Sequence, residues 1–228
     1  MNKIIGDKGK RTKYDPSLAD KVNKEVEAET FVDVPKIEPI SNIEDICNGY
    51  KEFMRQEKRD MNLPTDITDK YNPTKEQISE FSKKLVNYTE LDGFNIYTAN
   101  YLTALMHSNK NKEFTIDLTK LNEQGIFLDC LGYHLKNKKL TINGNAGEDT
   151  GFKANNSEIT VNGNVGNFVG IHSKNSKIIV KENAGSDVGF ISKNSEIYIE
   201  GNFKSFSIKI EEGTKIYQGK NKELIYPK

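Results

Sequence analysis

The sequence contains little of what would point to a particular chemistry. Its 228 residues include no tryptophan, only two cysteines (Cys47 and Cys130), and only three arginines among 33 basic residues. Two cysteines are too few for a disulfide scaffold, and scarce arginine argues against bidentate recognition of phosphate or carboxylate groups. The formal net charge is zero, so the composition does not imply a strongly charged partner such as DNA or an anionic membrane.

Long apolar runs and clusters of metal ligands are also missing. No stretch approaches the roughly 18 apolar residues of a membrane span. The basic start, MNKIIGDKGKRTKY, has no apolar segment typical of a signal peptide. We therefore expect a cytoplasmic protein without membrane association. The three histidines are not spaced as metal ligands, and the glycine-rich stretches lack the lysine and hydroxyl of a P-loop, so we expect no catalytic residue, no metal and no cofactor.

What the sequence does contain is a repeat of 19 residues, which begins near Gly132. Glycine, asparagine and β-branched residues recur in register without insertion over three or four copies, a pattern that excludes chance and indicates a solenoid. The recurring glycines are Gly132, Gly151, Gly170 and Gly189 in one set, and Gly147, Gly166 and Gly185 in another. The recurring asparagines are Asn145, Asn164 and Asn183.

The length of the repeat restricts the kind of solenoid. A unit of 19 residues is too short for a pair of helices but suits one coil of a parallel β-solenoid, with coils about 4.8 Å apart. Each unit carries an alternating pair such as Ile159 and Val161, which we expect to point inward and stack on the same pair in the next coil. Glycine should occupy corners where a Cβ would clash, and asparagine should stack into an amide ladder.

Three glycine-rich units carry a resemblance to a known domain. GNAGEDTG (144–151), GNVGNFVG (163–170) and ENAGSDVG (182–189) resemble the GXGXG β-helix domain, which is found in the glutamate synthase large subunit and makes up most of one formylmethanofuran dehydrogenase subunit. The resemblance implies a right-handed parallel β-helix. It also implies a non-catalytic role, because this domain supports and connects catalytic parts in both enzymes. Glu182 stands where the family pattern has glycine, and the activity of the parent enzymes is not carried over.

Helical signals precede the repeat. Ser41 and Glu44 predict a capping box for a first helix, and Thr74 and Gln77 predict a second. Before them, residues 1–40 are charged and poor in apolar residues, a composition typical of segments that do not fold alone. The predicted domains are a flexible charged arm (1–40), an amphipathic helix with a linker (41–73), a helical N-terminal cap of the solenoid (74–110), and the solenoid with its C-terminal cap (111–228).

These features favour a non-catalytic structural or interaction subunit. The solenoid would be a rigid platform, and the arm would be a tether that binds a protein partner or a second copy of the chain. The expected anchors are the densest apolar cluster of the arm: Phe31, Val32, Val34 and Ile37. Two alternatives stay open. The first is a carbohydrate-active or other β-helix enzyme; a carbohydrate-active one requires converging carboxylates and exposed aromatic rings. The second is weak nucleic-acid binding through the basic residues 1–13.

Overall fold

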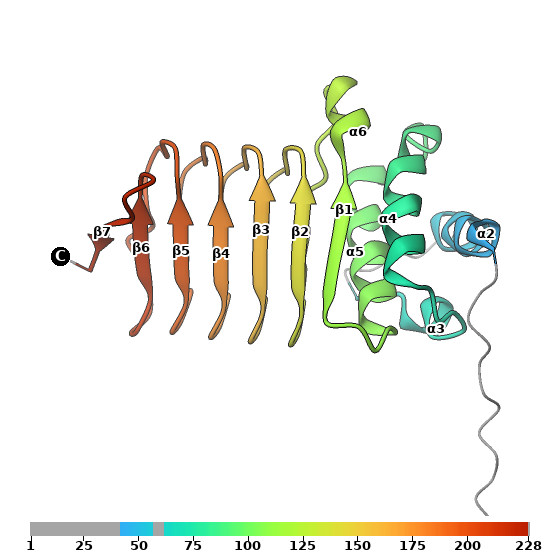
Figure 1. Ribbon diagram of the computed structural model, residues 1–228, viewed down its shortest axis with the longest axis horizontal. Helices are drawn as coiled ribbons and strands as arrows, with labels where there is room; N and C mark the ends of the chain where they lie inside the picture. The colour runs from blue at the N-terminus through green and yellow to red at the C-terminus, as the bar shows by residue number, and fades with distance from the viewer. Residues whose placement is uncertain (1–41, 57–61, 228) are drawn as a thin grey trace, which may run out of the picture. The chain divides into compact units, whose positions relative to one another are not determined.

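A computed structural model describes residues 42–56 and 62–227. The predicted arm lies outside these residues, together with its expected anchors Phe31, Val32, Val34 and Ile37. Within the described part, four helices precede a β-solenoid, and a fifth helix lies inside its first coil (Figure 1). The predicted fold class, a mainly β right-handed solenoid with N-terminal helices, is confirmed.

One face of the solenoid is a sheet whose strands follow each other in sequence order. Its strands are β1 (Glu113–Asp117), β2 (Lys139–Asn143), β3 (Glu158–Asn162), β4 (Lys177–Val180), β5 (Glu196–Ile199), β6 (Lys215–Gln218) and β7 (Glu223–Tyr226). Strands β1 to β6 pair in parallel, while β7 turns back antiparallel to β6. Followed from β1 to β6, the chain winds in a right-handed sense (Figure 1).

The register of the strands is that of the repeat. From β2 to β5 each residue pairs with the residue 19 positions later, as Leu140 does with Ile159. The first coil is longer because it contains the short helix α6 (Thr119–Glu123). Alternate strand residues point inward and stack into two rows that are at most 1% exposed. These rows are Leu140, Ile159, Ile178 and Ile197, and Ile142, Val161, Val180 and Ile199.

The two predicted glycine rows meet different requirements. Gly170 has a φ of +72°, a left-handed conformation that costs glycine little. Gly166 has no such φ, but a Cβ added there would lie 2.8 Å from the backbone nitrogen of Glu148 in the preceding coil. The first row therefore needs glycine for its backbone angle, and the second needs it for the close approach of successive coils.

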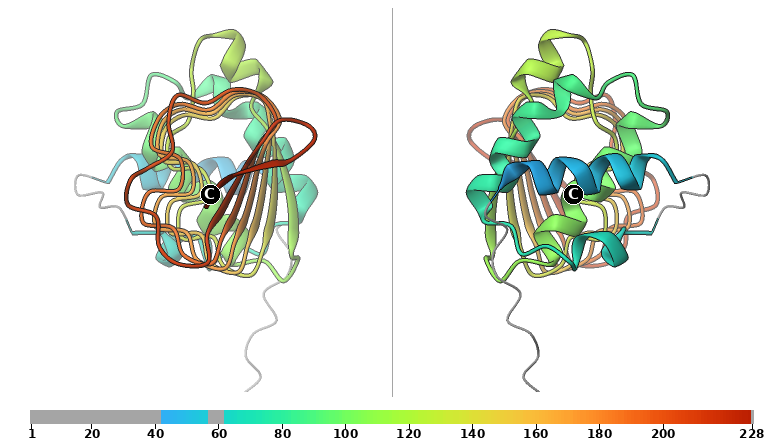
Figure 2. Two further views of the ribbon diagram at one scale, coloured as in Figure 1. Left: turned by 90° about the vertical axis from the view of Figure 1, so that its left-hand side faces the viewer. Right: turned by 90° about the vertical axis from the view of Figure 1, so that its right-hand side faces the viewer.

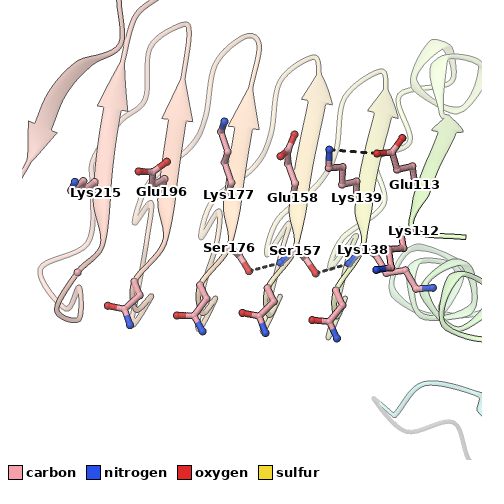
Figure 3. A pocket seen from close by; sticks show the side chains of 15 residues that line it. Lys112, Glu113, Lys138, Lys139, Ser157, Glu158, Ser176, Lys177, Glu196 and Lys215 are labelled. Carbon is pink, nitrogen blue, oxygen red and sulfur yellow. Dashed lines mark hydrogen bonds and ion pairs between the residues drawn. The ribbon is translucent and has the colours of Figure 1, made fainter.

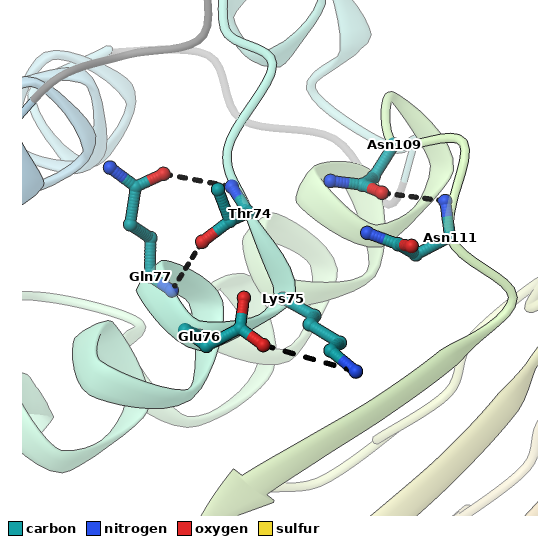
Figure 4. Close-up of polar contacts among 6 residues, drawn as sticks. All are labelled: Thr74, Lys75, Glu76, Gln77, Asn109 and Asn111. Carbon is teal, nitrogen blue, oxygen red and sulfur yellow. Dashed lines mark hydrogen bonds and ion pairs between the residues drawn. The ribbon is translucent and has the colours of Figure 1, made fainter.

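The helices before the solenoid are α2 (Ile43–Met54), α3 (Thr65–Thr68), α4 (Lys75–Lys84), the 3-10 turn η1 (Leu85–Asn87) and α5 (Phe94–His107). Helix α4 begins with the predicted capping box: Gln77 N donates to Thr74 Oγ1, and Thr74 N donates to Gln77 Oε1 (Figure 4). Helix α2 begins differently from the prediction. Its cap is Asn42, whose Oδ1 accepts from Glu44 N at 3.0 Å, so the box predicted with Ser41 is wrong. The predicted linker also contains α3, which buries Ile67.

The two edges of the sheet differ. Helix α4 lies along the free edge of β1, where Asp117 N donates to Ser82 Oγ at 2.9 Å. Helix α5 is buried over most of its length, and Figure 2 shows α2 crossing the N-terminal end of the solenoid. At the other end, β7 pairs with β6. One apolar core runs from these helices into the coils. None of the helices within the described ranges is long and apolar enough to cross a membrane.

Candidate interaction site: the outer face of the sheet

The outward side chains of the strands line up because the coils are in register. The first outward position carries a charge in every strand from β1 to β6, and the sign alternates along the solenoid (Figure 3). We call this set the charge row: Glu113, Lys139, Glu158, Lys177, Glu196 and Lys215. Adjacent coils are about 4.8 Å apart, so each charge has opposite charges beside it. Lys139 Nζ, for example, lies 3.4 Å from Glu113 Oε1.

The next outward position forms a second row that changes in size along the solenoid. We call it the size row: Thr115, Thr141, Thr160, Ile179, Tyr198 and Tyr217. Its first half is threonine, and its second half is bulky and apolar or aromatic. The rings of Tyr198 and Tyr217 stack with their centroids 4.4 Å apart. The outer face is therefore thin over β1 to β3 and thick over β4 to β6.

Tyr198 is held in place by its surroundings. Its hydroxyl donates to Glu196 Oε2 at 2.8 Å, and the Nζ atoms of Lys177 and Lys222 lie 5.3 and 5.4 Å from the centre of its ring. Burial raises the pKa of Tyr198, and the Glu196 carboxylate raises it further. The ring thus presents a neutral hydroxyl and a fixed aromatic face.

A groove of about 770 Å³ runs along the solenoid beside the charge row. Its opposite wall is a row of exposed corner residues with φ between +48° and +56°: Asn137, Asn156, Asn175 and Asn194. Asparagine tolerates this left-handed conformation better than most residues, which accounts for the row structurally. In the groove, Ser157 and Ser176 are buried and bonded to neighbouring backbone, with Ser157 N donating to Ser176 Oγ. Lys138 Nζ donates to the carbonyls of Asn109 and Asn111 at one end.

The predicted asparagines form an amide ladder on another corner. Asn145 Oδ1 accepts from the backbone N and the Nδ2 of Asn164, at 2.7 and 3.1 Å, and Asn164 does the same for Asn183. Asn122 of α6 begins the ladder, and its Oδ1 accepts from Asn145 N at 2.6 Å. These side chains are therefore structural. Sequence analysis missed Asn122 because the longer first coil places it outside the 19-residue spacing.

Two of the predicted glycines, Gly147 and Gly166, line a second cavity of about 580 Å³, together with the half-exposed ring of Phe127. The backbone N–H groups of Gly147, Gly166 and Gly185 all donate to carbonyls of the preceding coil, at 2.9 to 3.0 Å. A phosphate cradle needs such groups to point at the ligand. The glycines are therefore occupied in holding the coils together.

The thiol and acids beside this cavity do not form a nucleophilic site. Burial raises the pKa of Cys130 to about 12, and the carboxylates of Asp149 and Asp129 contribute in the same direction. The thiol therefore stays protonated, whereas the thiolate is the reactive form. Burial, helped by Glu148, also raises the pKa of Asp149.

The histidines are dispersed. His107 Nε2 lies 3.1 Å from the carbonyl of His134, and burial lowers the pKa of His107. The ring of Phe152 packs against both Tyr133 and His172. The sequence analysis missed this aromatic cluster, although Tyr133 and Phe152 are 19 residues apart. Within residues 42–56 and 62–227, no group of three or more His, Cys, Asp or Glu side chains is placed to hold a metal ion.

Comparison of the chain with known protein families, with curated proteins and with solved structures gives no match. The resemblance of its glycine units to the GXGXG domain therefore stays a prediction. Among the described residues, the outer face of the sheet carries two regular rows of side chains, the charge row and the size row.

Proposed function

We propose that the protein is a non-catalytic interaction subunit: a rigid solenoid whose outer sheet face docks a protein partner. The observation that carries the proposal is the charge row, which presents six alternating charges at regular spacing on a backbone fixed by inter-coil hydrogen bonds. Complementary charge patterns across an interface select the partner and fix its register more than they add affinity. A regular pattern on a rigid face suits that use.

The catalytic alternative has less support on the same face. The carboxylates of Glu113, Glu158 and Glu196 are two coils apart, or about 10 Å, and a lysine stands between each pair. Glycosidase carboxylates lie about 5 to 9.5 Å apart across the scissile bond. Opposite signs at every step also give no continuous positive track for a nucleic-acid backbone.

The tether and the location remain parts of the proposal. We keep the expectation that residues 1–40 contact a partner through Phe31, Val32, Val34 and Ile37. Both cysteines are free and buried, which agrees with a cytoplasmic location, where thiols stay reduced.

Photo-crosslinking in the native cell tests this function. A photoreactive amino acid would replace Thr160, near the middle of the outer face, and in a matched control would replace Thr65, an exposed threonine at the start of α3. We expect covalent protein adducts from position 160 and few or none from position 65. Equal yields from the two positions, or no adduct from position 160, would contradict the proposal.

A further inference from the structure

We propose that the partner on this face is a second copy of the chain. The two copies would form a dimer with a two-fold axis parallel to the strands, between β3 and β4, and with their solenoid axes antiparallel. The inference rests on the proposed function of the outer face and names its partner. In such an isologous interface the same surface must complement itself.

The charge row meets that requirement. From β1 to β6 it reads Glu, Lys, Glu, Lys, Glu, Lys, and in the opposite direction it begins with lysine. An antiparallel copy therefore places an opposite charge at every position. The pairs between copies are Glu113 with Lys215, Lys139 with Glu196, and Glu158 with Lys177. A parallel copy in the same register would place like charges together at all six positions.

The size row is self-complementary by the same operation. The same axis places Thr115 against Tyr217, Thr141 against Tyr198, and Thr160 against Ile179. Each small side chain of one copy meets a large one of the other, so the thick half of the face fits the thin half. Lys222, which reaches over the Tyr198 ring, adds to the thick half, where the opposing copy has threonine.

The size row supports pairing between copies more strongly than the charge row does. Alternating charge also has a use within one chain, because opposite charges on neighbouring strands attract and Lys139 and Glu113 already form an ion pair. The gradient of the size row is not required for pairing within the sheet, where identical residues stack equally well. Six strands at about 4.8 Å span only about 24 Å, a small interface, so we expect a dimer that dissociates on dilution and in high salt.

Three variants separate pairing between copies from pairing within a chain. Reversing the second half of the charge row (K177E/E196K/K215E) or the first half (E113K/K139E/E158K) keeps alternation within each half and adds one like-charged contact between β3 and β4. Either variant alone then places like charges together at every pair between copies, while an equimolar mixture restores every opposite pair. A third variant, E113K/K215E, disrupts alternation at both ends of the row within the chain, leaves the net charge unchanged, retains Glu196 beside Tyr198 and preserves all pairs between copies.

Sedimentation velocity of the full-length proteins at low and high salt decides the question, with circular dichroism confirming that each variant is folded. We expect concentration-dependent dimers for the wild type, for E113K/K215E and for the mixture, and monomers for each half-reversed variant alone. A wild type that stays monomeric at every concentration, or half-reversed variants that dimerise as the wild type does, would overturn the inference. Adducts of Thr160 with a different protein, beside a monomeric wild type, would leave the proposed function standing and remove only this partner.

Discussion

Gly166 shows how a single residue determines the distance between coils. Its Cβ position is blocked by backbone atoms of Gly147 and Glu148, at 2.9 and 2.8 Å, and backbone cannot move aside as the end of a flexible side chain can. A substitution at this corner therefore forces the coils apart or breaks the hydrogen bond from Gly166 N to the Gly147 carbonyl.

We expect Gly166→Val to lower the free energy of unfolding by about 3 kcal/mol, the upper part of the range for overpacking. Gly125→Ala is the control. Gly125 has a φ of +73° and open space around it. Gly125→Ala should therefore lower the free energy of unfolding only by the cost of a left-handed backbone at alanine, about 1–2 kcal/mol. Chemical denaturation measures both. A Gly166→Val protein as stable as the wild type would show that the coils are not so closely packed.

Asp149 gives a prediction for pH. Burial and neighbouring carboxylates raise its pKa above the usual 3.8, so the folded state binds this proton more tightly than the unfolded state. The ionised carboxylate therefore destabilises the protein at pH above both pKa values, and the penalty is lost as the pH falls through the folded-state pKa. Asp149→Asn should raise the melting temperature at neutral pH, and the gain should shrink toward pH 4.

Asp187→Asn is the control for that variant, because Asp187 has a φ of +57° against +56° for Asp149 and lies two coils further on. It repeats the change from aspartate to asparagine in a left-handed position, outside the cluster of Asp129, Glu148 and Asp149. A gain for Asp149→Asn that is the same at both pH values would assign the effect to the backbone and not to the charge.

At the scale of the elements, the amide ladder connects successive coils on the corner after each strand. Removing the Asn164 amide would leave the backbone N–H of Asn183 without its acceptor at an exposed corner, and such a hydrogen bond contributes about 0.5–1.5 kcal/mol net. We expect Asn164→Ala to lower the unfolding free energy by about that amount.

Asn202 is the matched control, because it is the last member of the ladder: its backbone N donates to Asn183 Oδ1, and Asn202→Ala retains that bond. Asn202→Ala should lower the free energy of unfolding by no more than about 0.5 kcal/mol. Equal costs for Asn164→Ala and Asn202→Ala, measured by denaturation, would mean that the ladder adds nothing to stability.

The repeat predicted the solenoid because stacked coils without insertions have equal length, so residues with the same environment recur at equal spacing. The repeat spacing predicted the inward rows and the glycine corners. It did not predict α3, α6 or Asn122, which lie outside the periodic part, or the antiparallel β7, which follows the last regular coil.

The charge row was missed for a different reason. A search for repeats looks for the same residue in every coil, whereas Glu158, Lys177 and Glu196 alternate and so recur only at every second coil. The signal is present in the sequence, but it becomes visible only after the register has placed these residues on one face. The size row is likewise a gradient and not a repeat.

At the scale of the molecule, the two ends and the side of the solenoid differ in what they offer a partner. Helix α4 covers the edge of β1, and at the other edge the short strand β7 runs antiparallel to β6, so only one short, reversed edge strand is left as a template for adding another strand. The outer face between them stays exposed and carries both self-complementary rows. This arrangement favours the proposed assembly through the side of the solenoid.

Zero-length carbodiimide cross-linking of an equimolar mixture of isotopically light and heavy protein tests that assembly most directly. Within one chain, Lys139 and Glu196 are three coils apart, and Lys215 and Glu113 are five coils apart, or about 14 and 24 Å at about 4.8 Å per coil. Neither pair can be joined by a zero-length link unless it comes from two copies. We expect both linked peptide pairs to appear with one light and one heavy member. Links found solely between neighbouring coils of one chain, such as Lys139 with Glu113, would contradict the account.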